Sequence, residues 1–399
     1  GRPAPLHRLN RTEYANAVHD LLSVEIDPTS MLPPDAQAYG FDTNADALGV
    51  DPALLDRYLV AAPKTAPVAA GDPAIPPAFE RYTAVRGNTN EQTWLWQTER
   101  LGESFSLGSR GGITARHYFP VDGEYVFRVR LLRTYAGTIR GLNTPATIEV
   151  RVDGARVGQF TIGGGTAEAR ENADDVLQVR APMTAGLHQV LATIVKTEGI
   201  KAEGLGPARI PIWNREGDVG SAELAISSLL VGGPYNGRVP SDSPSRRRIF
   251  VCRPANASDD TAWPTKIVST VARTAYRRQV TRDDVETLME FYRRGRAEHD
   301  FDNGIRAALE RVLTSPDFLF RIEADPAKLP PGTAYRLSDV ELASRLSFFL
   351  WSSIPDDELL DLAIRGTLRD PGVLDGQVRR MLAEPRARGA LVDNFFGQW

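Results

Sequence analysis

The hydrophobic pattern of the chain changes its period twice. From about residue 6 to 70, apolar positions recur every three or four residues, which predicts helices. In "LHRLNRTEYANAVHDLLSV", Asn10 and Glu13 have the spacing of a capping box, so we expect a helix to begin there. A second helix is predicted for "DPALLDRYLVAA". The following "PKTAPVAAGDPAIPP" is rich in proline and alanine and is predicted to be a linker.

Between about residues 79 and 235, apolar and polar residues alternate, as in half-buried strands. Asp153-Gly154 joins two alternating runs and predicts a hairpin. "VLQVRAPMTAGLHQVLATIV" repeats this arrangement across a turn that contains glycine, and "AELAISSLLVGG" supplies a late strand. Short strands at this spacing favour an antiparallel β-sandwich, which we expect to be jelly-roll-like. The alternation in "GEYVFRVRLL" predicts one buried face, made of Tyr125, Phe127, Val129 and Leu131.

From about residue 260, the helical period returns and continues to the end of the sequence. Thr281 with Asp284, and Ser338 with Glu341, have the spacing expected of residues that cap a new helix. Pro316 is expected to stop or bend a helix. Apolar and aromatic residues at helical spacing are more often core than a cofactor pocket. A core role is therefore predicted for Phe348, Phe349, Leu350 and Trp351.

These changes of period predict an α+β multidomain chain, a mainly helical body interrupted by a β-sandwich. We expect an N-terminal helical segment at 1–70 and a sandwich with its linkers at 71–245. Helical domains are expected at 246–330 and 331–399. The sequence begins at Gly1 without a visible signal peptide, and its last predicted helix runs to Trp399 without a breaker. We therefore expect it to be an internal piece of a longer protein.

Composition excludes several classes of protein. No run approaches the roughly 18 apolar residues of a membrane-spanning helix, so no transmembrane segment is predicted. The net charge of −4 gives no general attraction to nucleic acid. The single cysteine, Cys252, excludes an internal disulfide, a Cys-rich zinc site and an iron–sulfur cluster. Because C-x-x-C-H does not occur, haem is expected only in a module outside these residues.

Catalytic motifs are not recognisable, so the sequence leaves enzymatic activity open. Among the five histidines there is no HExxH helix, and ordinary polar surface roles are predicted for His7 and His19. No G-x-S-x-G nucleophile elbow occurs either. Paired carboxylates such as Glu216 and Asp218 could serve glycoside hydrolysis only at a suitable separation, which sequence spacing does not determine.

The stretch "SPSRRRIFVCRP" sets three consecutive arginines beside Cys252. Neither a wider basic surface nor interleaved aromatic residues surround it in the sequence, so a nucleic-acid contact is disfavoured. We expect a strand or extended linker at the exit of the sandwich. Its arginines would pair with carboxylates of the helical body.

The most suggestive candidate for a ligand site is the long segment 198–220, because long loops in compact domains are often functional. Its tryptophan could stack on a sugar ring, and its polar residues could accept hydrogen bonds from hydroxyls or hold Ca²⁺. Two arginines elsewhere in the predicted sandwich could add donors. In the alternative interpretation, the segment packs on the helical body with its tryptophan buried. The candidate ligand-binding residues are Trp213, Asn214, Glu216, Asp218, Arg110 and Arg140.

Several long motifs resemble a known family. They include "LHRLNRTEYANAVHDLL", "LPPDAQAYGFDTNADALGV", "GDVGSAELAISSLLVGGPYN", "ARTAYRRQVTRDDVETLMEFYRRGR" and "RLSDVELASRLSFFLWSSIPDDELLDLA". The chain resembles a planctomycete-type family of uncharacterised, PSD-type domains. These often accompany a cytochrome c-like module, and the sandwich is similar to carbohydrate-binding modules. The resemblance implies a periplasmic, secreted or cell-surface setting, with further domains of the full-length protein as partners.

The resemblance also bears on Cys252. Relatives carry a second cysteine shortly after the "VCRP" motif, where this chain has Trp263 or a neighbouring residue. Without that partner, Cys252 is expected to be a buried free thiol.

The expected function is an extracytoplasmic binding and scaffold segment with polysaccharide as its ligand. Two alternatives stay open. In the first, these residues shape the substrate cleft of a redox enzyme that acts on carbohydrates. In the second, they form a purely structural module for protein interaction.

Overall fold

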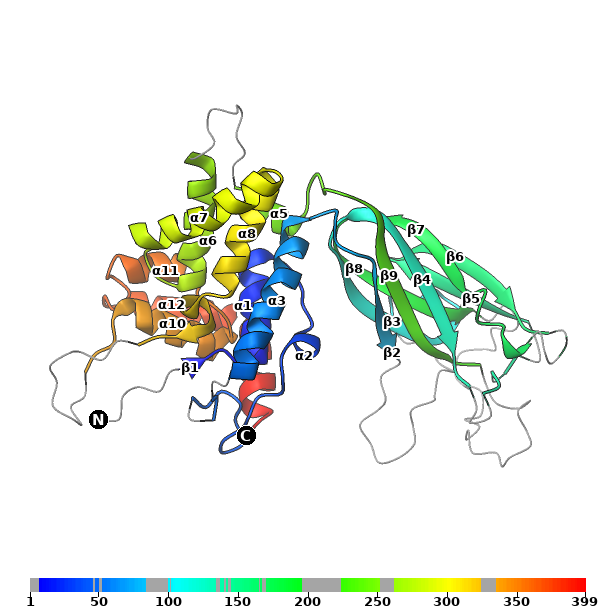
Figure 1. The fold of residues 1–399 in the computed structure, drawn as a ribbon. Coiled ribbons are helices and arrows are strands. Elements are labelled where there is room, and N and C mark those ends of the chain that lie inside the picture. The colour runs from blue at the N-terminus through cyan, green and yellow to red at the C-terminus, as the bar shows by residue number, and fades with distance from the viewer. Residues whose placement is uncertain are drawn as a thin grey trace. The chain divides into compact units, whose positions relative to one another are not determined.

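The structure, a computed structural model, describes residues 7–45, 47–49, 52–83, 100, 102–133, 137–139, 141–142, 145–164, 166, 170–195, 224–251, 262–323 and 335–399. The chain divides into two compact units (Figure 1). The helical unit contains Gly1–Asp72 and Ser241–Trp399, and the β unit contains Pro73–Pro240. The predicted α+β class with antiparallel sheets is confirmed.

In the helical unit, the described residues form a series of helices and one two-stranded antiparallel sheet. Its elements are β1 (His7–Arg8), α1 (Arg11–Leu22), α2 (Pro28–Met31), α3 (Pro52–Ala70), α5 (Pro244–Ile249), α6 (Ala262–Tyr276), α7 (Arg282–Glu298), α8 (Phe301–Leu313), α9 (Pro316–Leu319), β10 (Phe320–Arg321), α10 (Asp339–Trp351), α11 (Asp357–Ile364), α12 (Val373–Ala383), α13 (Pro385–Gly389) and the π-helix η2 (Ala390–Phe396).

Capping boxes begin three of these helices, as predicted. Asn10, Thr281 and Ser338 each accept a hydrogen bond from the backbone N–H three residues later. The acidic residue at that third position bonds back to the cap backbone in every case. Each box satisfies two backbone groups that the first helical turn leaves without intrahelical partners.

Segments that precede and follow the β unit in the sequence build the helical unit together. β1 pairs antiparallel with β10, and the Leu9 backbone N–H donates to the Leu319 carbonyl at 2.9 Å. The Tyr14 ring of α1 lies 5.2 Å from the ring of Tyr58 in α3 and 6.0 Å from that of Phe318 in α9. The first and last thirds of the chain therefore share one packed interior.

The linker predicted at residues 63–77 is wrong over its first half. α3 continues through Pro63 and Pro67 to Ala70. Pro63 has no backbone N–H to donate to the Leu59 carbonyl one turn earlier. Because Pro63 and Leu59 are both exposed, that carbonyl can bond to water instead. Burial of the opposite face, which includes Ala62 and Ala66, compensates for the interrupted ladder.

The strand or extended linker predicted for the arginine stretch is also wrong, because residues 244–249 form the short helix α5. The Ser243 side chain accepts from the Arg246 backbone N–H, and Pro244 stands in the first turn, where its missing donor is not needed. The predicted pairing of the arginines with carboxylates of the helical unit is confirmed. Arg246 lies 2.7 Å from Asp302 and Arg248 lies 3.7 Å from Asp357.

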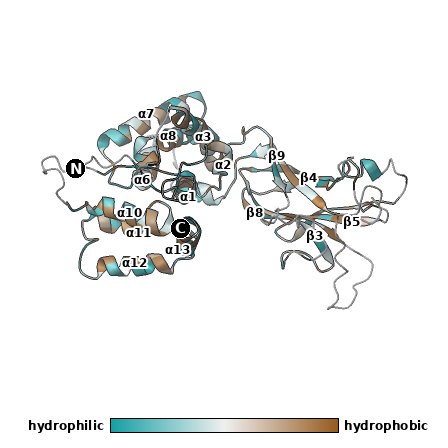
Figure 2. Cartoon of the chain, turned by 90° about the horizontal axis from the view of Figure 1, so that it is seen from below, coloured by the Kyte–Doolittle hydropathy of each residue, from teal (hydrophilic) through white to brown (hydrophobic). Residues whose placement is uncertain are grey.

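In the β unit, the described residues form two four-stranded antiparallel sheets, with strand orders β2-β9-β4-β7 and β3-β8-β5-β6. Figure 2, seen from below, shows β4 and β9 in one layer and β3 and β5 in the other. The strands are β2 (Ala78–Thr83), β3 (Ser109–Phe119), β4 (Asp122–Leu131), β5 (Ala146–Val152), β6 (Ala155–Ile162), β7 (Gln178–Met183), β8 (Gly186–Val195) and β9 (Ile226–Arg238).

Of the two hairpins predicted in the β unit, one is found. β5 pairs with β6 across Asp153-Gly154, both of which have positive φ as a tight two-residue turn requires. β7 and β8 follow each other closely, but β7 pairs with β4 whereas β8 pairs with β3 and β5. Their connection therefore passes from one sheet to the other, a choice that the alternating pattern does not encode.

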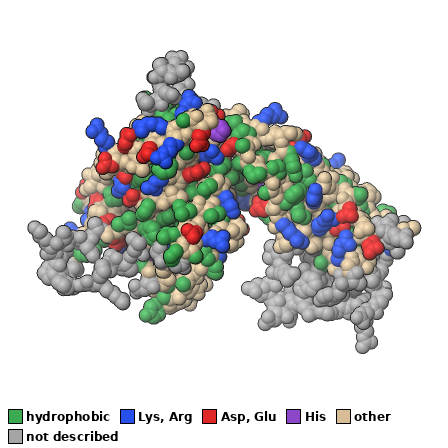
Figure 3. Space-filling model, viewed as in Figure 1, with side chains coloured by type: hydrophobic (Ala, Val, Ile, Leu, Met, Phe, Trp, Pro, Cys, Tyr) green, Lys and Arg blue, Asp and Glu red, His purple; other side chains and the backbone are tan. Residues whose placement is uncertain are grey.

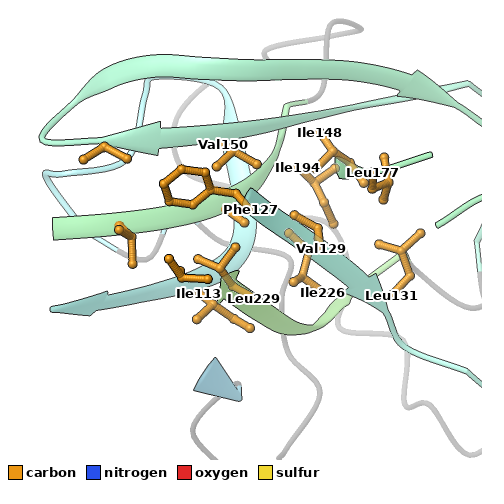
Figure 4. Packing of buried hydrophobic residues seen from close by; sticks show 14 of the residues in the cluster. Ile113, Phe127, Val129, Leu131, Ile148, Val150, Leu177, Ile194, Ile226 and Leu229 are labelled. Carbon is orange, nitrogen blue, oxygen red and sulfur yellow. The ribbon is translucent and has the colours of Figure 1, made fainter. Parts of the chain in front are cut away.

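Inner faces of the two sheets share one hydrophobic core (Figure 4). Phe127 and Val129 of β4 enter it from one sheet, and Ile148, Val150 and Ile194 enter from the other. The face predicted from "GEYVFRVRLL" is confirmed, because all four of its apolar side chains are in this core.

A second core joins α10 to the last helices of the helical unit. The core role predicted for Phe348, Leu350 and Trp351 is confirmed. Phe349 differs, since 57 % of it is exposed.

Candidate functional site

Most of the ligand-binding residues predicted from the sequence lie outside the described residues. These are Trp213, Asn214, Glu216 and Asp218 of the long segment, together with Arg140. Cys252 lies outside them too. Arg110 is described, and it stands near the start of β3.

Arg110 belongs to a bulge between β3 and β8, where the strand register shifts between Arg110 and Ile113. The next two residues are glycines with positive φ, and a side-chain carbon on Gly112 would meet the Ala192 carbonyl oxygen at 2.2 Å. The bulge therefore needs glycine for close backbone approach. The Arg110 guanidinium donates to the neighbouring Ser109 carbonyl at 2.8 Å. These contacts give the segment a structural role.

Outward-facing side chains of the sheet β2-β9-β4-β7 form a second candidate. Because Tyr125, Phe127 and Val129 enter the core, alternation turns Glu124, Val126, Arg128 and Arg130 of β4 away from it. Strand pairing places residues of the adjacent strands beside them. We call this surface the outer face, made of Phe79, Arg81, Leu230, Gly232, Tyr235, Glu124, Val126, Arg128, Arg130, Gln178 and Arg180.

At one position of the outer face, an aromatic ring lies on a glycine and a guanidinium lies over the ring. Phe79 pairs with Gly232, and a side-chain carbon on that glycine would fall 2.2 Å from the ring. The Arg128 guanidinium carbon is 4.6 Å from the centre of the Phe79 ring. The Phe79 ring lies there because it covers Gly232, yet 42 % of Phe79 stays exposed. Arg128 also donates to the Gln178 side chain at 2.5 Å.

A second ring and guanidinium pair lies on the same face. The Arg180 guanidinium carbon is 4.8 Å from the centre of the Tyr235 ring. Arg180 also lies 2.8 Å from the Glu124 carboxylate, which accepts a hydrogen bond from Asn236 at 2.6 Å. Two cation–π pairs therefore stand on strands β2, β4, β7 and β9, beside one carboxylate.

Positive charge prevails at the centre of the outer face. Four arginines (Arg81, Arg128, Arg130 and Arg180) face outward there, against the carboxylate of Glu124. Asp175 lies 2.7 Å from Arg130, and this hydrogen bond raises the pKa of that guanidinium. Figure 3, viewed with β4 and β9 toward the reader, shows Lys and Arg side chains, together with some Asp and Glu, among hydrophobic ones on this side of the β unit.

The sequence contains part of the pattern that identifies this face. Alternation in "GEYVFRVRLL" puts Arg128 and Arg130 opposite the buried face, so a polar face of β4 follows from it. The pattern does not show that Phe79 and Tyr235, from strands far away in the sequence, stand beside them. Strand order supplies that neighbourhood.

Two further features are absent from the described residues. Among them, no group of three or more His, Cys, Asp and Glu side chains could hold a metal ion. In the same part of the chain, no helix has both the length and the apolar character needed to cross a membrane.

By fold, the chain is a helical unit whose sequence is interrupted by a β unit, where the described strands form two antiparallel sheets. Three family models match segments of the helical unit, each described as a protein of unknown function. They are PSD3 (DUF1587) at residues 7–71, PSD5 (DUF1595) at 265–323 and PSD4 (DUF1592) at 337–399. The chain therefore contains these three domains, consistent with the planctomycete-type uncharacterised family. The comparison with curated proteins finds no match.

Proposed function

We propose that the chain is a binding segment whose β unit recognises polysaccharide, and that acidic glycans are its preferred class. The observation that carries this proposal is the outer face, where two aromatic rings stand beside outward-facing arginines. Exposed ring edges and guanidinium planes offer apolar surface to the C–H face of a sugar. The same guanidiniums donate in a fork that matches carboxylate or sulfate oxygens.

Strand order supports the kind of fold that the proposal needs. The sheet orders β2-β9-β4-β7 and β3-β8-β5-β6 bring the first strand of the β unit beside its last and the second beside the next to last. We infer a jelly-roll-like sandwich from this order, an architecture that occurs in lectin domains. Because fold alone does not determine function, the outer face and not the fold supports glycan binding.

The charge of the outer face narrows the ligand class. The whole chain has a net charge of −4, yet outward-facing arginines outnumber carboxylates at the centre of this sheet. A neutral glycan would leave these donors to water and to their present partners. Uronate or sulfate groups would instead form charge-assisted hydrogen bonds with them.

The proposal keeps the setting that the family resemblance implies. In it, the chain is extracytoplasmic and any cytochrome c-like module lies outside these residues. A calcium ion in the segment 198–220 remains a prediction. One rival function, a structural interaction module, becomes an outcome of the test below. The other, a substrate-shaping part of a redox enzyme, stays a prediction.

A glycan array probed with the full chain tests the proposal. We expect acidic polysaccharides such as polygalacturonate to bind and neutral xylan and cellulose to bind at least about tenfold more weakly. The double variant Arg128→Gln/Arg180→Gln should lose about tenfold or more in affinity for the acidic glycan. Arg116→Gln is the matched control, because Arg116 is an exposed arginine on β3 of the other sheet.

Two results would count against the proposal. If no glycan binds, the structural interaction module is favoured. If glycans bind equally well to the double variant and to the control variant, the ligand contacts another part of the protein.

A further inference from the structure

A cavity of about 520 Å³ lies in the helical unit, beside the small sheet β1–β10 and helix α10. Its volume is in the range of small-molecule sites. Apolar side chains and a few charged groups converge on it, which is also typical of such sites. The lining residues are His7, Ala45, Arg321, Glu323, Leu342, Arg345, Leu346 and Phe349.

Among the described residues, two guanidiniums and one carboxylate line this cavity. Arg345 donates to both oxygens of Glu323, at 2.6 Å each. Glu323 therefore pairs with Arg345, which is the cation nearer to the solvent because more than half of its side chain is exposed. Arg321 is the second cation, and it is largely buried.

Among the described residues, Arg321 lacks a close counter-ion. Its nearest carboxylate, that of Glu13, is 3.9 Å away and also accepts a hydrogen bond from the Asn10 backbone at 3.0 Å. The buried Arg321 Nε has no hydrogen-bond partner among the described residues. A buried charge without full pairing is unfavourable, so an additional anion would be stabilising here.

A third guanidinium, that of Arg277, adds positive charge near Arg321. Arg277 is buried, and neutral backbone carbonyls such as those of Phe318 and Phe320 accept its hydrogen bonds. Its guanidinium carbon is 5.7 Å from the centre of the Phe348 ring, and that of Arg321 is 5.0 Å from the same ring.

His7 contributes no charge to the cavity at neutral pH. The Arg321 guanidinium lies against its ring. Burial, and then Arg321, lower the pKa of His7 to about 3. His7 is half-buried and in contact with Arg321, whereas the sequence predicts an ordinary polar surface role for it.

We propose that this cavity binds a small organic carboxylate. Its anionic end would lie between Arg321 and Arg345, where positive charge exceeds negative charge among the described residues. Its apolar body would lie against Leu342, Leu346 and Phe349. This site belongs to the helical unit and is independent of the glycan-binding proposal, so either can fail without the other.

Titration calorimetry of the full chain tests the site with three probes: benzoate, its neutral analogue benzamide, and inorganic sulfate. We expect benzoate to bind saturably and at least about tenfold more tightly than benzamide or sulfate. Absence of saturable benzoate binding would overturn the proposal. Equal affinity for benzamide would exclude recognition of the carboxylate, and equal or tighter binding of sulfate would exclude an organic ligand.

Two variants change affinity in opposite directions if the site is correct. Arg345→Gln removes a cation and leaves Glu323 unpaired, so benzoate should bind about tenfold or more weakly. Glu323→Gln removes the competing carboxylate and should tighten benzoate binding several-fold. A merely structural ion pair would not produce tighter binding.

Arg379→Gln is the matched control for these variants. Arg379 is an exposed arginine of α12 that pairs with Asp375 in the same unit. Its replacement should leave benzoate affinity within about twofold. The proposal is wrong if Arg345→Gln has no larger effect than this control. Circular dichroism of each variant establishes that the helical unit is folded, and Arg345→Gln alone decides if Glu323→Gln does not fold.

Discussion

Arg246 shows how one side chain joins three separate elements. It is 4 % exposed, and its guanidinium donates to the Ala70 carbonyl at the end of α3 and to Asp302 of α8. The same guanidinium carbon lies 4.3 Å from the centre of the Phe250 ring. Arg246 therefore connects α5 to α3, which precedes the β unit in the sequence, and to α8, which follows it.

We expect Arg246→Ala to lower the free energy of unfolding by about 3 kcal/mol, because it removes a buried charge and leaves its acceptors unpaired. The adjacent Arg247 is 61 % exposed on its side chain and pairs with the exposed Asp242, so Arg247→Ala should cost less than about 1 kcal/mol. Urea unfolding followed by circular dichroism measures both variants. Equal losses would contradict the assigned role of Arg246.

His7 makes stability depend on pH. Burial and Arg321 lower its pKa from 6.5 to about 3 in the folded chain. Between these two values the unfolded chain binds a proton that the folded chain does not bind, so stability decreases as the pH falls through this window. At about 1.4 kcal/mol per pH unit, this group should contribute a loss of about 2 kcal/mol between pH 7 and pH 5.

In His7→Gln that part of the pH dependence should disappear. The change in free energy of unfolding between pH 7 and pH 5 should therefore be smaller than in the wild-type chain. His299→Gln, at an exposed position after α7, is the control and should keep the wild-type dependence. Identical pH profiles for the wild-type chain and His7→Gln would rule out the environment that the structure gives to His7.

At the scale of elements, helix starts could be predicted because a capping box depends on two residues three positions apart. Asn10 with Glu13 is such a local pair. The course of α3 could not be predicted, since Pro63 is tolerated only because that side of the helix faces solvent. Burial of the other side is a tertiary property. The assignment of β7 and β8 to different sheets depends in the same way on packing of the whole β unit.

The position of Pro63 leads to a stabilising substitution. Pro63→Ala restores a backbone donor within α3 and removes a ring that crowds the preceding turn, so the chain should gain about 1–3 kcal/mol. Pro52→Ala is the control, because Pro52 stands at the first position of the same helix, where proline is tolerated. Thermal unfolding compares the two. If Pro63→Ala destabilises the chain more than Pro52→Ala, the proline has a packing role that this account lacks.

At the scale of the whole molecule, the β unit is inserted in the sequence between the two parts of the chain that build the helical unit. The change of hydrophobic period indicates the two kinds of structure, because each period reflects local geometry. The candidate site was harder to predict. Arg128 could be placed on a polar strand face, but its position over Phe79 follows from the pairing of β2 with β9 and of β9 with β4. The predicted residues of segment 198–220 lie outside the described residues.

The most direct test of the central claim is arginine-selective labelling of the unmodified full chain with phenylglyoxal, with and without polygalacturonate, followed by mass spectrometry. Labelling reports the accessibility of each guanidinium, and both sheets have exposed arginines to compare. If the outer face binds the glycan, the glycan should reduce labelling of Arg81 and Arg180, which lie on that face. Labelling of Arg116 and Arg156 on the other sheet should stay unchanged. Equal protection on both sheets, or protection confined to arginines of the helical unit, would contradict glycan binding by the outer face.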